Sequence, residues 1–135
     1  MPEAFYFYQD EKKEILKESL LTQQAVEWAR KFIRPERPDT PLTSAQLRRF
    51  YNDVKSLSAR VTEQDFLKFK PVVKMLKSKV AYACPRANPR NRKIPEIFRS
   101  FIDEMVENVE DYKDFKAFCI TFEAVVGYFY GEGGR

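Results

Sequence analysis

Four carboxylates toward the C-terminal end are the side chains whose type and spacing best suit catalysis. They are Asp103, Glu107, Glu110 and Asp114. Their spacing of i, i+4, i+7 and i+11 would place them on one face of a continuous helix, where carboxylate oxygens could hold Mg²⁺. However, Asp111 and the polar stretch around Asn108 indicate a helix break within the row, and no second carboxylate cluster exists to complete a site. A solvated acidic face is therefore the favoured interpretation.

The sequence offers few residues for nucleophilic catalysis or for binding a cofactor. Its 135 residues include no His, which excludes mechanisms that need a Ser-His or Cys-His pair or a His-bound metal. Cys84 and Cys119 match no metal-binding spacing and are expected to be free thiols that pack as small apolar groups. All four Gly lie at or after Gly127, so Gly-rich phosphate loops are absent. The sequence predicts a protein that is not an enzyme and has no metal or cofactor.

Charge is distributed unevenly along the chain. The 24 Lys and Arg against 20 Asp and Glu give a net charge of +4. Residues 41–93 carry 13 cations and 3 anions, whereas residues 94–135 carry 4 cations and 9 anions. A basic block of this kind favours a polyanionic partner. Alternatively, the acidic end of one copy could meet the basic block of the next, which favours head-to-tail self-association. At least a dimer is expected, from the aromatic N-terminus and the long first helix.

The cations of the basic block flank apolar helical stripes. Long cationic side chains in such positions can reach phosphates laid along the helix surface, and binding of that kind weakens as salt rises. Helical spacing and the basic loop before residue 94 select a set of candidate contacts to a polyanion. These are Lys55, Lys74, Arg90, Arg92 and Lys93.

Aromatic residues have two possible roles. Tyr51 and Tyr82 lie in the basic block and could stack on nucleobases, but both fall on or beside apolar stripes, so core packing is expected. Residues 4–8 include four aromatic side chains. Left exposed they would promote aggregation, so this segment is expected to fold onto the bundle or onto a partner subunit.

The elements that must position these residues are all helical. Apolar residues recur at steps of three and four, and no strand-type alternation competes. Thr43 with Gln46, and Thr62 with Asp65, have the spacing of helix-start caps, Pro71 predicts a kink or restart, and Asp111 can cap the last helix. The expected helices cover residues 10–33, about 43–61, about 65–83 and about 95–109, and the stretch from Asp111 to the glycines after 130.

The predicted fold is all-α, a compact bundle of about five helices in a single domain over residues 1–135. Its parts are an N-terminal helix with a Pro-rich linker (1–42), a basic helical core and loop (43–93), and acidic C-terminal helices (94–135). The longest apolar run, residues 124–130, is far shorter than the roughly 20 residues of a membrane span. With no leader-type start either, a cytoplasmic, reducing location is expected.

Three segments, in order, resemble the small subunit of type III-A CRISPR effector complexes, the Csm small subunit. Residues 43–52 (TSAQLRRFYN) are similar to a helix start in that family. Residues 76–83 (LKSKVAYA), followed by Arg86, are similar to a second family stretch. Residues 114–129, with Phe-Glu-Ala followed by two apolar residues, Gly and Tyr, resemble its closing helix.

This resemblance implies a non-catalytic, all-helical subunit that acts in antiviral defence. Several copies would stack beside the backbone subunits and help hold guide RNA and target RNA against the complex, while target cleavage belongs to a backbone subunit. The family-matched cations are Arg48, Arg49, Lys77, Lys79 and Arg86. The alternative that the residues leave open is a protein-only interaction module whose basic block meets an acidic protein.

Overall fold

Helices form the regular structure of the part of the chain that the computed structural model describes, residues 5–135. They are α1 (Glu18–Leu21), α2 (Gln23–Ile33), α3 (Ser44–Arg60), α4 (Phe66–Lys74), α5 (Leu76–Ala83), the 3₁₀ turn η1 (Pro89–Asn91), α6 (Glu96–Glu107) and α7 (Tyr112–Gly131). The all-α prediction is confirmed. The five expected helices are present, and two of them are each divided in two.

Side-chain caps fix the starts of α3 and α7. The Thr43 hydroxyl accepts a hydrogen bond from the backbone N–H of Gln46, whose side-chain oxygen accepts one from the Thr43 N–H. Asp111 and Asp114 make the same reciprocal pair at the start of α7. Each pair satisfies amide groups that have no partner within the helix. Both starts were expected from the sequence, and both are confirmed.

The predicted start of the first helix at residue 10 is wrong. The carboxylate of Asp10 accepts hydrogen bonds from the N–H groups of Glu14 and Ile15, and the N–H of Gln9 donates to the carbonyl of Ile15. These bonds close a turn, because an Asp side chain can hold its own backbone in a non-helical conformation. The helix therefore begins at Glu18, and it is interrupted again at Thr22.

Pro71 lies inside α4, and the break between α4 and α5 comes one turn later, at Met75. The N–H of Met75 still donates to the carbonyl of Pro71, so the two helices run on in nearly one direction. Val73, Leu76 and Val80 are buried on the side that faces the bundle. The pair forms one long outer arm of the bundle, with α5 packed on α6.

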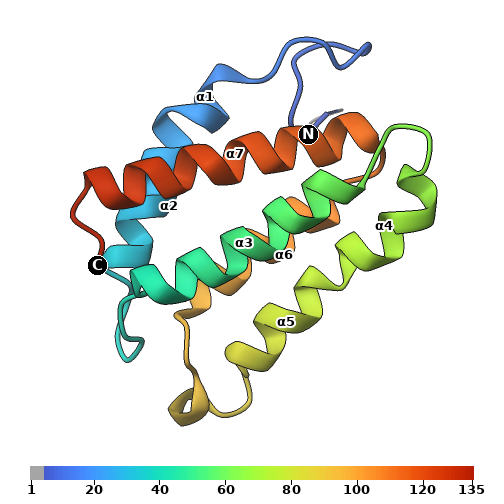
Figure 1. Ribbon diagram of the computed structural model, residues 1–135. Coiled ribbons are helices and arrows are strands. Elements are labelled where there is room, and N and C mark those ends of the chain that lie inside the picture. The colour runs from blue at the N-terminus through green and yellow to red at the C-terminus, as the bar shows by residue number, and fades with distance from the viewer. Residues whose placement is uncertain (1–4) are drawn as a thin grey trace.

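A cluster of phenylalanine rings joins the other helices. Phe98 of α6 is fully buried, and its ring centroid lies 5.1 Å from that of Phe32 in α2 and 5.2 Å from that of Phe50 in α3. Phe122 of α7 lies edge-on to Phe98 and Phe101. Such edge-to-face pairs add to the stabilisation from apolar burial. The α3 helix packs mainly on α7, and α6 runs behind it in the view of Figure 1.

The aromatic N-terminal segment folds onto this bundle where it is described. Phe7 is fully buried, and the hydroxyl of the buried Tyr8 donates to the carbonyl of Lys113, 2.6 Å away. Tyr6 donates to Glu104. Residue 4, which belongs to the same aromatic segment, lies outside the described residues. The aromatic side chains from Phe5 onward are thus used inside the chain.

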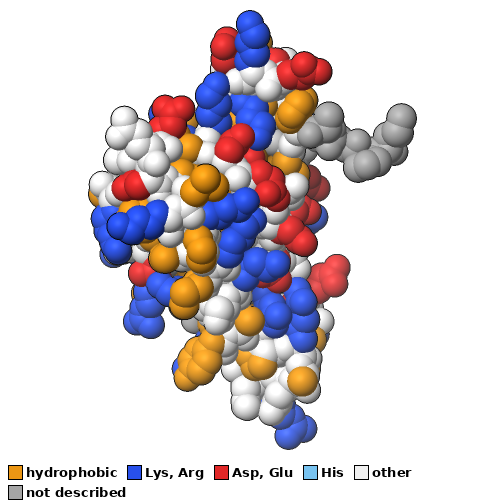
Figure 2. All heavy atoms as spheres, turned by 90° about the vertical axis from the view of Figure 1, so that its right-hand side faces the viewer, with side chains coloured by type: hydrophobic (Ala, Val, Ile, Leu, Met, Phe, Trp, Pro, Cys, Tyr) orange, Lys and Arg blue, Asp and Glu red, His pale blue; other side chains and the backbone are white. Residues whose placement is uncertain are grey.

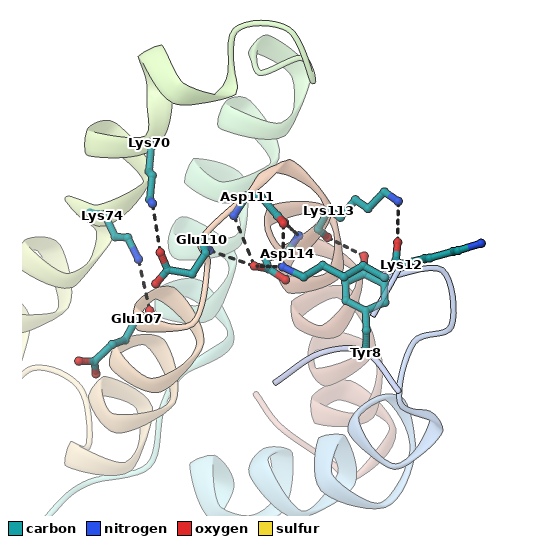
Figure 3. Close-up of polar contacts among 10 residues, drawn as sticks. Tyr8, Lys12, Lys70, Lys74, Glu107, Glu110, Asp111, Lys113 and Asp114 are labelled. Atoms are coloured by element: carbon teal, nitrogen blue, oxygen red, sulfur yellow. Dashed lines mark hydrogen bonds and ion pairs between the residues drawn. The ribbon is translucent and has the colours of Figure 1, made fainter. Parts of the chain in front are cut away.

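Lys13 fastens this segment to the start of α7. Its Nζ lies 2.7 Å from a carboxylate oxygen of Asp111 and 3.0 Å from one of Asp114, and its side chain is only 17% exposed. Burial acts to raise the pKa of Asp111, but the hydrogen bonds from Lys13 and the backbone outweigh it and hold that pKa below its usual value. Figure 3 shows Asp111 and Asp114 together at this point, with Lys12 extending away.

Within residues 5–135, none of the helices combines the length and the apolar character that crossing a bilayer requires.

The substitution Lys13→Met should lower the free energy of unfolding by about 3 kcal/mol at pH 7, because it leaves the buried Asp114 carboxylate without its cation. Urea denaturation measures this. The folded pKa of Asp111 is depressed, so the stabilisation is present above its ordinary value of 3.8 and is lost as pH falls through the folded pKa. The difference between the variant and the native chain should therefore shrink at the lowest pH.

The matched control is Lys12→Met, which removes an exposed cation one residue away. Its free energy of unfolding should stay within about 0.5 kcal/mol of the native value. Equal losses in the two variants would contradict the role of Lys13.

Candidate nucleic-acid interface

A groove of about 470 Å³ lies between α3 and α5. It is lined by Gln46, Arg49, Phe50, Asp53, Met75, Ser78, Lys79, Tyr82, Ala83, Lys93 and Ile94. The groove exists because α3 packs on α7 while α5 packs on α6, so the two walls are held apart by different neighbours. Figure 2 faces the right-hand side of Figure 1, where the α4–α5 arm lies, and shows a row of orange apolar side chains beside a band of blue cations.

The two walls present residues at the same helical spacing. On α3 the groove residues are Gln46, Arg49, Phe50 and Asp53, and on the other wall they are Met75, Ser78, Lys79 and Tyr82. Both sets follow i, i+3, i+4, i+7, which is one face of a helix. The segment before α6 closes one end, since the N–H of Lys93 donates to the carbonyl of Ala83 and the Gln46 amide donates to the carbonyl of Lys93.

Positive charge dominates the groove. Arg49, Lys79 and Lys93 line it together with one carboxylate, Asp53. Asp53 and Lys79 face each other across the groove at 3.2 Å, and both are partly exposed, so the pair is weak. Arg49 and Lys93 are exposed, and the Nζ of Lys93 stands 5.7 Å from the ring centroid of Tyr82. An anion that enters the groove meets three cations and a single competing carboxylate.

The floor of the groove is apolar, and its rim carries an exposed tyrosine. Phe50 packs on the core ring of Phe98, and Ile94 is buried. Tyr82, in contrast, is 82% exposed. The expectation that Tyr82 packs in the core is therefore wrong: Val80 takes the inward position on α5, and a residue two places later lies about 200° around the helix. Tyr51 does pack against Phe122, as expected, with centroids 5.7 Å apart.

Of the ten predicted cations, the structure brings Arg49, Lys79 and Lys93 together in the groove. Arg48 and Lys55 lie on the opposite flank of α3. A guanidinium nitrogen of Arg48 donates to the Tyr130 hydroxyl of α7 at 3.2 Å, and Lys55 stands 5.5 Å from the ring centroid of Tyr51. These two exposed cations form a separate patch.

Lys74 and Lys77 lie on the side of the α4–α5 arm that faces α6. The Nζ of Lys74 lies 2.8 Å from the carbonyl oxygen of Val106 and 3.4 Å from that of Glu107, so it satisfies the C-terminal end of α6. Burial lowers the pKa of Lys74. Lys77 is half-buried nearby. Lys74 therefore has a structural contact of its own.

The three arginines of the basic loop differ from one another. Arg86 forms ion pairs with Glu96 at 2.7 Å and with Asp103 at 3.3 Å. Arg92 is only 16% exposed and pairs at 2.9 Å with Asp39, whose side chain is 9% exposed. Arg90 is exposed on η1. Arg92 therefore ties the loop to the Pro-rich linker.

The acidic C-terminal row is divided and paired. The α6 helix ends at Glu107, so the expected break near Asn108 is confirmed. Lys70 of α4 pairs with Glu110 at 3.2 Å, as Figure 3 shows, and Asp114 pairs with Lys13. Over the described part of the chain, no three Cys, Asp or Glu side chains gather as metal ligands would. The basic block and the acidic end thus meet within one chain at several points.

Both cysteines are free thiols, Cys84 buried and Cys119 half-buried. Burial raises the pKa of each to about 11. They therefore stay protonated near neutral pH and pack as small apolar groups, as expected.

Sequence reasoning missed several residues of the groove. The sequence predicts a capping role for Gln46 and gives no role to Asp53 or Met75. What these residues share in the sequence is the i, i+3, i+4, i+7 spacing with Arg49 and Lys79. This spacing places them on a helix face that is separate from the buried stripes of α3 and α5. Only the placement of the two helices shows that these faces meet.

A family model described as Csm2 Type III-A matches residues 15–134. No curated protein and no solved structure matches the chain.

The substitution Arg92→Gln should lower the free energy of unfolding, because it leaves the Asp39 carboxylate, whose side chain is 9% exposed, without its cation. Arg90→Gln removes the same charge two residues away, at an exposed position, and should change stability by less than about 0.5 kcal/mol. Urea denaturation of both variants measures the contrast. Equal midpoints would show that Arg92 is not structural.

Proposed function

Because the chain belongs to the Csm2 Type III-A family, and so is a subunit of a type III-A CRISPR effector complex, we propose that it is the non-catalytic small subunit that helps hold guide RNA and target RNA in that complex. The observation that carries the proposal is the groove between α3 and α5, which gathers Arg49, Lys79 and Lys93. The role belongs to antiviral defence in the cytoplasm.

The groove suits an RNA backbone. Its cations come from two helices and from the segment before α6, so they can meet successive phosphates of one strand. Lys and Arg contacts to phosphates carry no sequence information, which suits a subunit that must accept any guide and target. The patch formed by Arg48 and Lys55, together with Arg90 and Lys77, would extend the contact with weaker, longer-range attraction.

A non-catalytic role fits the arrangement of the carboxylates. Glu110, Asp103 and Asp114 each have a cationic partner within the chain. These pairs stabilise the fold and hold the arm and the N-terminal segment in place. The small subunit would therefore need neither metal nor cofactor, and its partners would be the RNA strands and the other Csm subunits.

We also propose self-association to at least a dimer through the outer face of α4. Leu67 is 79% exposed and Val72 is 40% exposed. Both belong to the α4–α5 arm, and Figure 2 shows an apolar row on that side of the molecule. Exposed apolar rows of this kind are buried in partner contacts. The head-to-tail charge attraction is weaker than the sequence alone indicated, because Lys70 and Arg86 already meet carboxylates of their own chain. The apolar row is therefore the main support for a second copy.

The triple variant Arg49→Gln, Lys79→Gln, Lys93→Gln should bind single-stranded RNA more weakly and with less salt dependence. Each lost phosphate contact lowers the slope of log K against log salt by about 0.7, so the slope should fall by roughly 2. Fluorescence anisotropy of the full chain at several salt concentrations measures it. Asp53→Asn should have the opposite effect on affinity, because it removes the competing carboxylate and frees Lys79.

The matched control removes three cations that lie outside the groove: Lys12→Gln, Lys31→Gln and Lys116→Gln. It makes the same change in net charge, so a loss that depends on total charge would appear equally in both triple variants. An unchanged slope in the groove variant would refute RNA binding at this site. A pull-down of partner proteins that survives ribonuclease unchanged, with no RNA recovered, would favour the protein-only interaction module.

For self-association, light scattering at high protein concentration should give at least a dimer, and Leu67→Glu should shift it to monomer, because a charge cannot be buried unpaired in the contact. Ile15→Glu changes an apolar side chain that is 55% exposed outside the row and should leave the dimer intact. A monomeric native chain would contradict the proposal.

A further inference from the structure

Tyr82 stands at the rim of the α3–α5 groove with most of its ring in solvent. Its side chain is 82% exposed, although it belongs to a helix whose other face is buried. Lys93 lies over the ring, with its Nζ 5.7 Å from the centroid. A cation on one ring face leaves the other face open to a flat partner.

The space beside this ring is apolar and of small-ligand size. Met75, which is 59% exposed, and the ring of Phe50 line it together with Ile94. Its volume of about 470 Å³ lies within the range of roughly 300–1,000 Å³ that is usual for small-molecule pockets. A flat, partly apolar group can therefore enter between the two helices.

The amide and the carboxylate of the groove are already engaged. The Gln46 side chain accepts from the N–H of Thr43 and donates to the carbonyl of Lys93, and the Asp53 carboxylate pairs with Lys79. Side chains committed in this way offer few donors or acceptors for the edges of particular bases. Recognition in the groove would come from ring stacking, which tolerates any base, rather than from hydrogen-bond readout.

We infer that the groove between α3 and α5 is a subsite for one unstacked nucleobase of an RNA strand, stacked on Tyr82, with its flanking phosphates on Arg49, Lys79 and Lys93. This inference rests on the proposed RNA-binding function and adds to it a preference for single-stranded or distorted RNA over a regular duplex, whose bases are already stacked. The charge of the rim selects this occupant. An apolar peptide would gain nothing from the three cations, whereas a nucleotide uses both the ring and the charges.

The test compares Tyr82→Phe, Tyr82→Leu and Tyr82→Ala in the full chain. The probes are a single-stranded RNA oligonucleotide and the same sequence as a blunt duplex. Phe keeps an aromatic face and should bind the single strand like the native chain. Leu keeps apolar bulk without that face, so it and Ala should each lose roughly 5- to 100-fold in single-strand affinity. Duplex affinity should change little in all three.

Salt dependence separates this inference from the proposed function. Losing the ring removes no phosphate contact, so the Tyr82 variants should keep the native salt slope while the cation variants reduce it. Native affinity in all three Tyr82 variants, with a weakened cation triple variant, would overturn the base subsite and leave backbone binding standing. If the cation variants also bind like the native chain, both proposals fail.

Two further results would overturn the subsite alone. If Tyr82→Leu binds the single strand as tightly as the native chain does, the ring provides only apolar contact. If Tyr82→Ala loses capture of partner Csm subunits but keeps RNA affinity, the groove is a protein-docking surface. Because Tyr82 is so exposed, its variants should fold, and thermal unfolding checks this directly.

Discussion

Packing of aromatic rings around Phe98 is the interaction on which the rest of the structure depends. This one buried ring touches phenylalanines of α2, α3 and α7 and so fixes four helices relative to one another. Close packing of large rings allows few alternative arrangements. The α4–α5 arm lies outside this cluster and is held by α6. The separation between the arm and α3, and with it the groove, follows from that division.

Electrostatics then divides the cations into two groups with different tasks. Lys13, Lys74 and Arg92 lie mostly out of solvent and complete the fold, by pairing with carboxylates or by satisfying a helix end. Arg49 and Lys93 remain exposed at the groove. Exposed cations of this kind can exchange their counterions for RNA phosphates. Net charge along the sequence therefore overstates the binding surface, because much of it is neutralised within the chain.

Local signals in the sequence predicted the parts of the fold that local energetics controls. The caps at Thr43 and Asp111 stand where their spacing placed them, and the break near Asn108 follows from the same reasoning. The expected start of the first helix is wrong because the Asp10 carboxylate stabilises a turn, and the contact of Lys13 with the start of α7 joins this turn to the bundle. The core position expected for Tyr82 is wrong because its neighbours along the chain are apolar while its own side chain points outward.

The sequence by itself determined the all-helical class, most helix starts, the buried stripes and the family to which the chain belongs, because periodicity, caps and motif order are properties of neighbouring residues. Only the tertiary structure decided which cations are exposed to a partner and which pair with carboxylates of the same chain. Arg90 and Arg92 belong to the same basic loop, and the sequence gives no reason to treat them differently. They differ because Asp39, more than fifty residues away, lies beside Arg92. The tertiary structure also forms the groove. Its two walls come from α3 and α5, and these helices stand apart because α3 packs on α7 and α5 packs on α6.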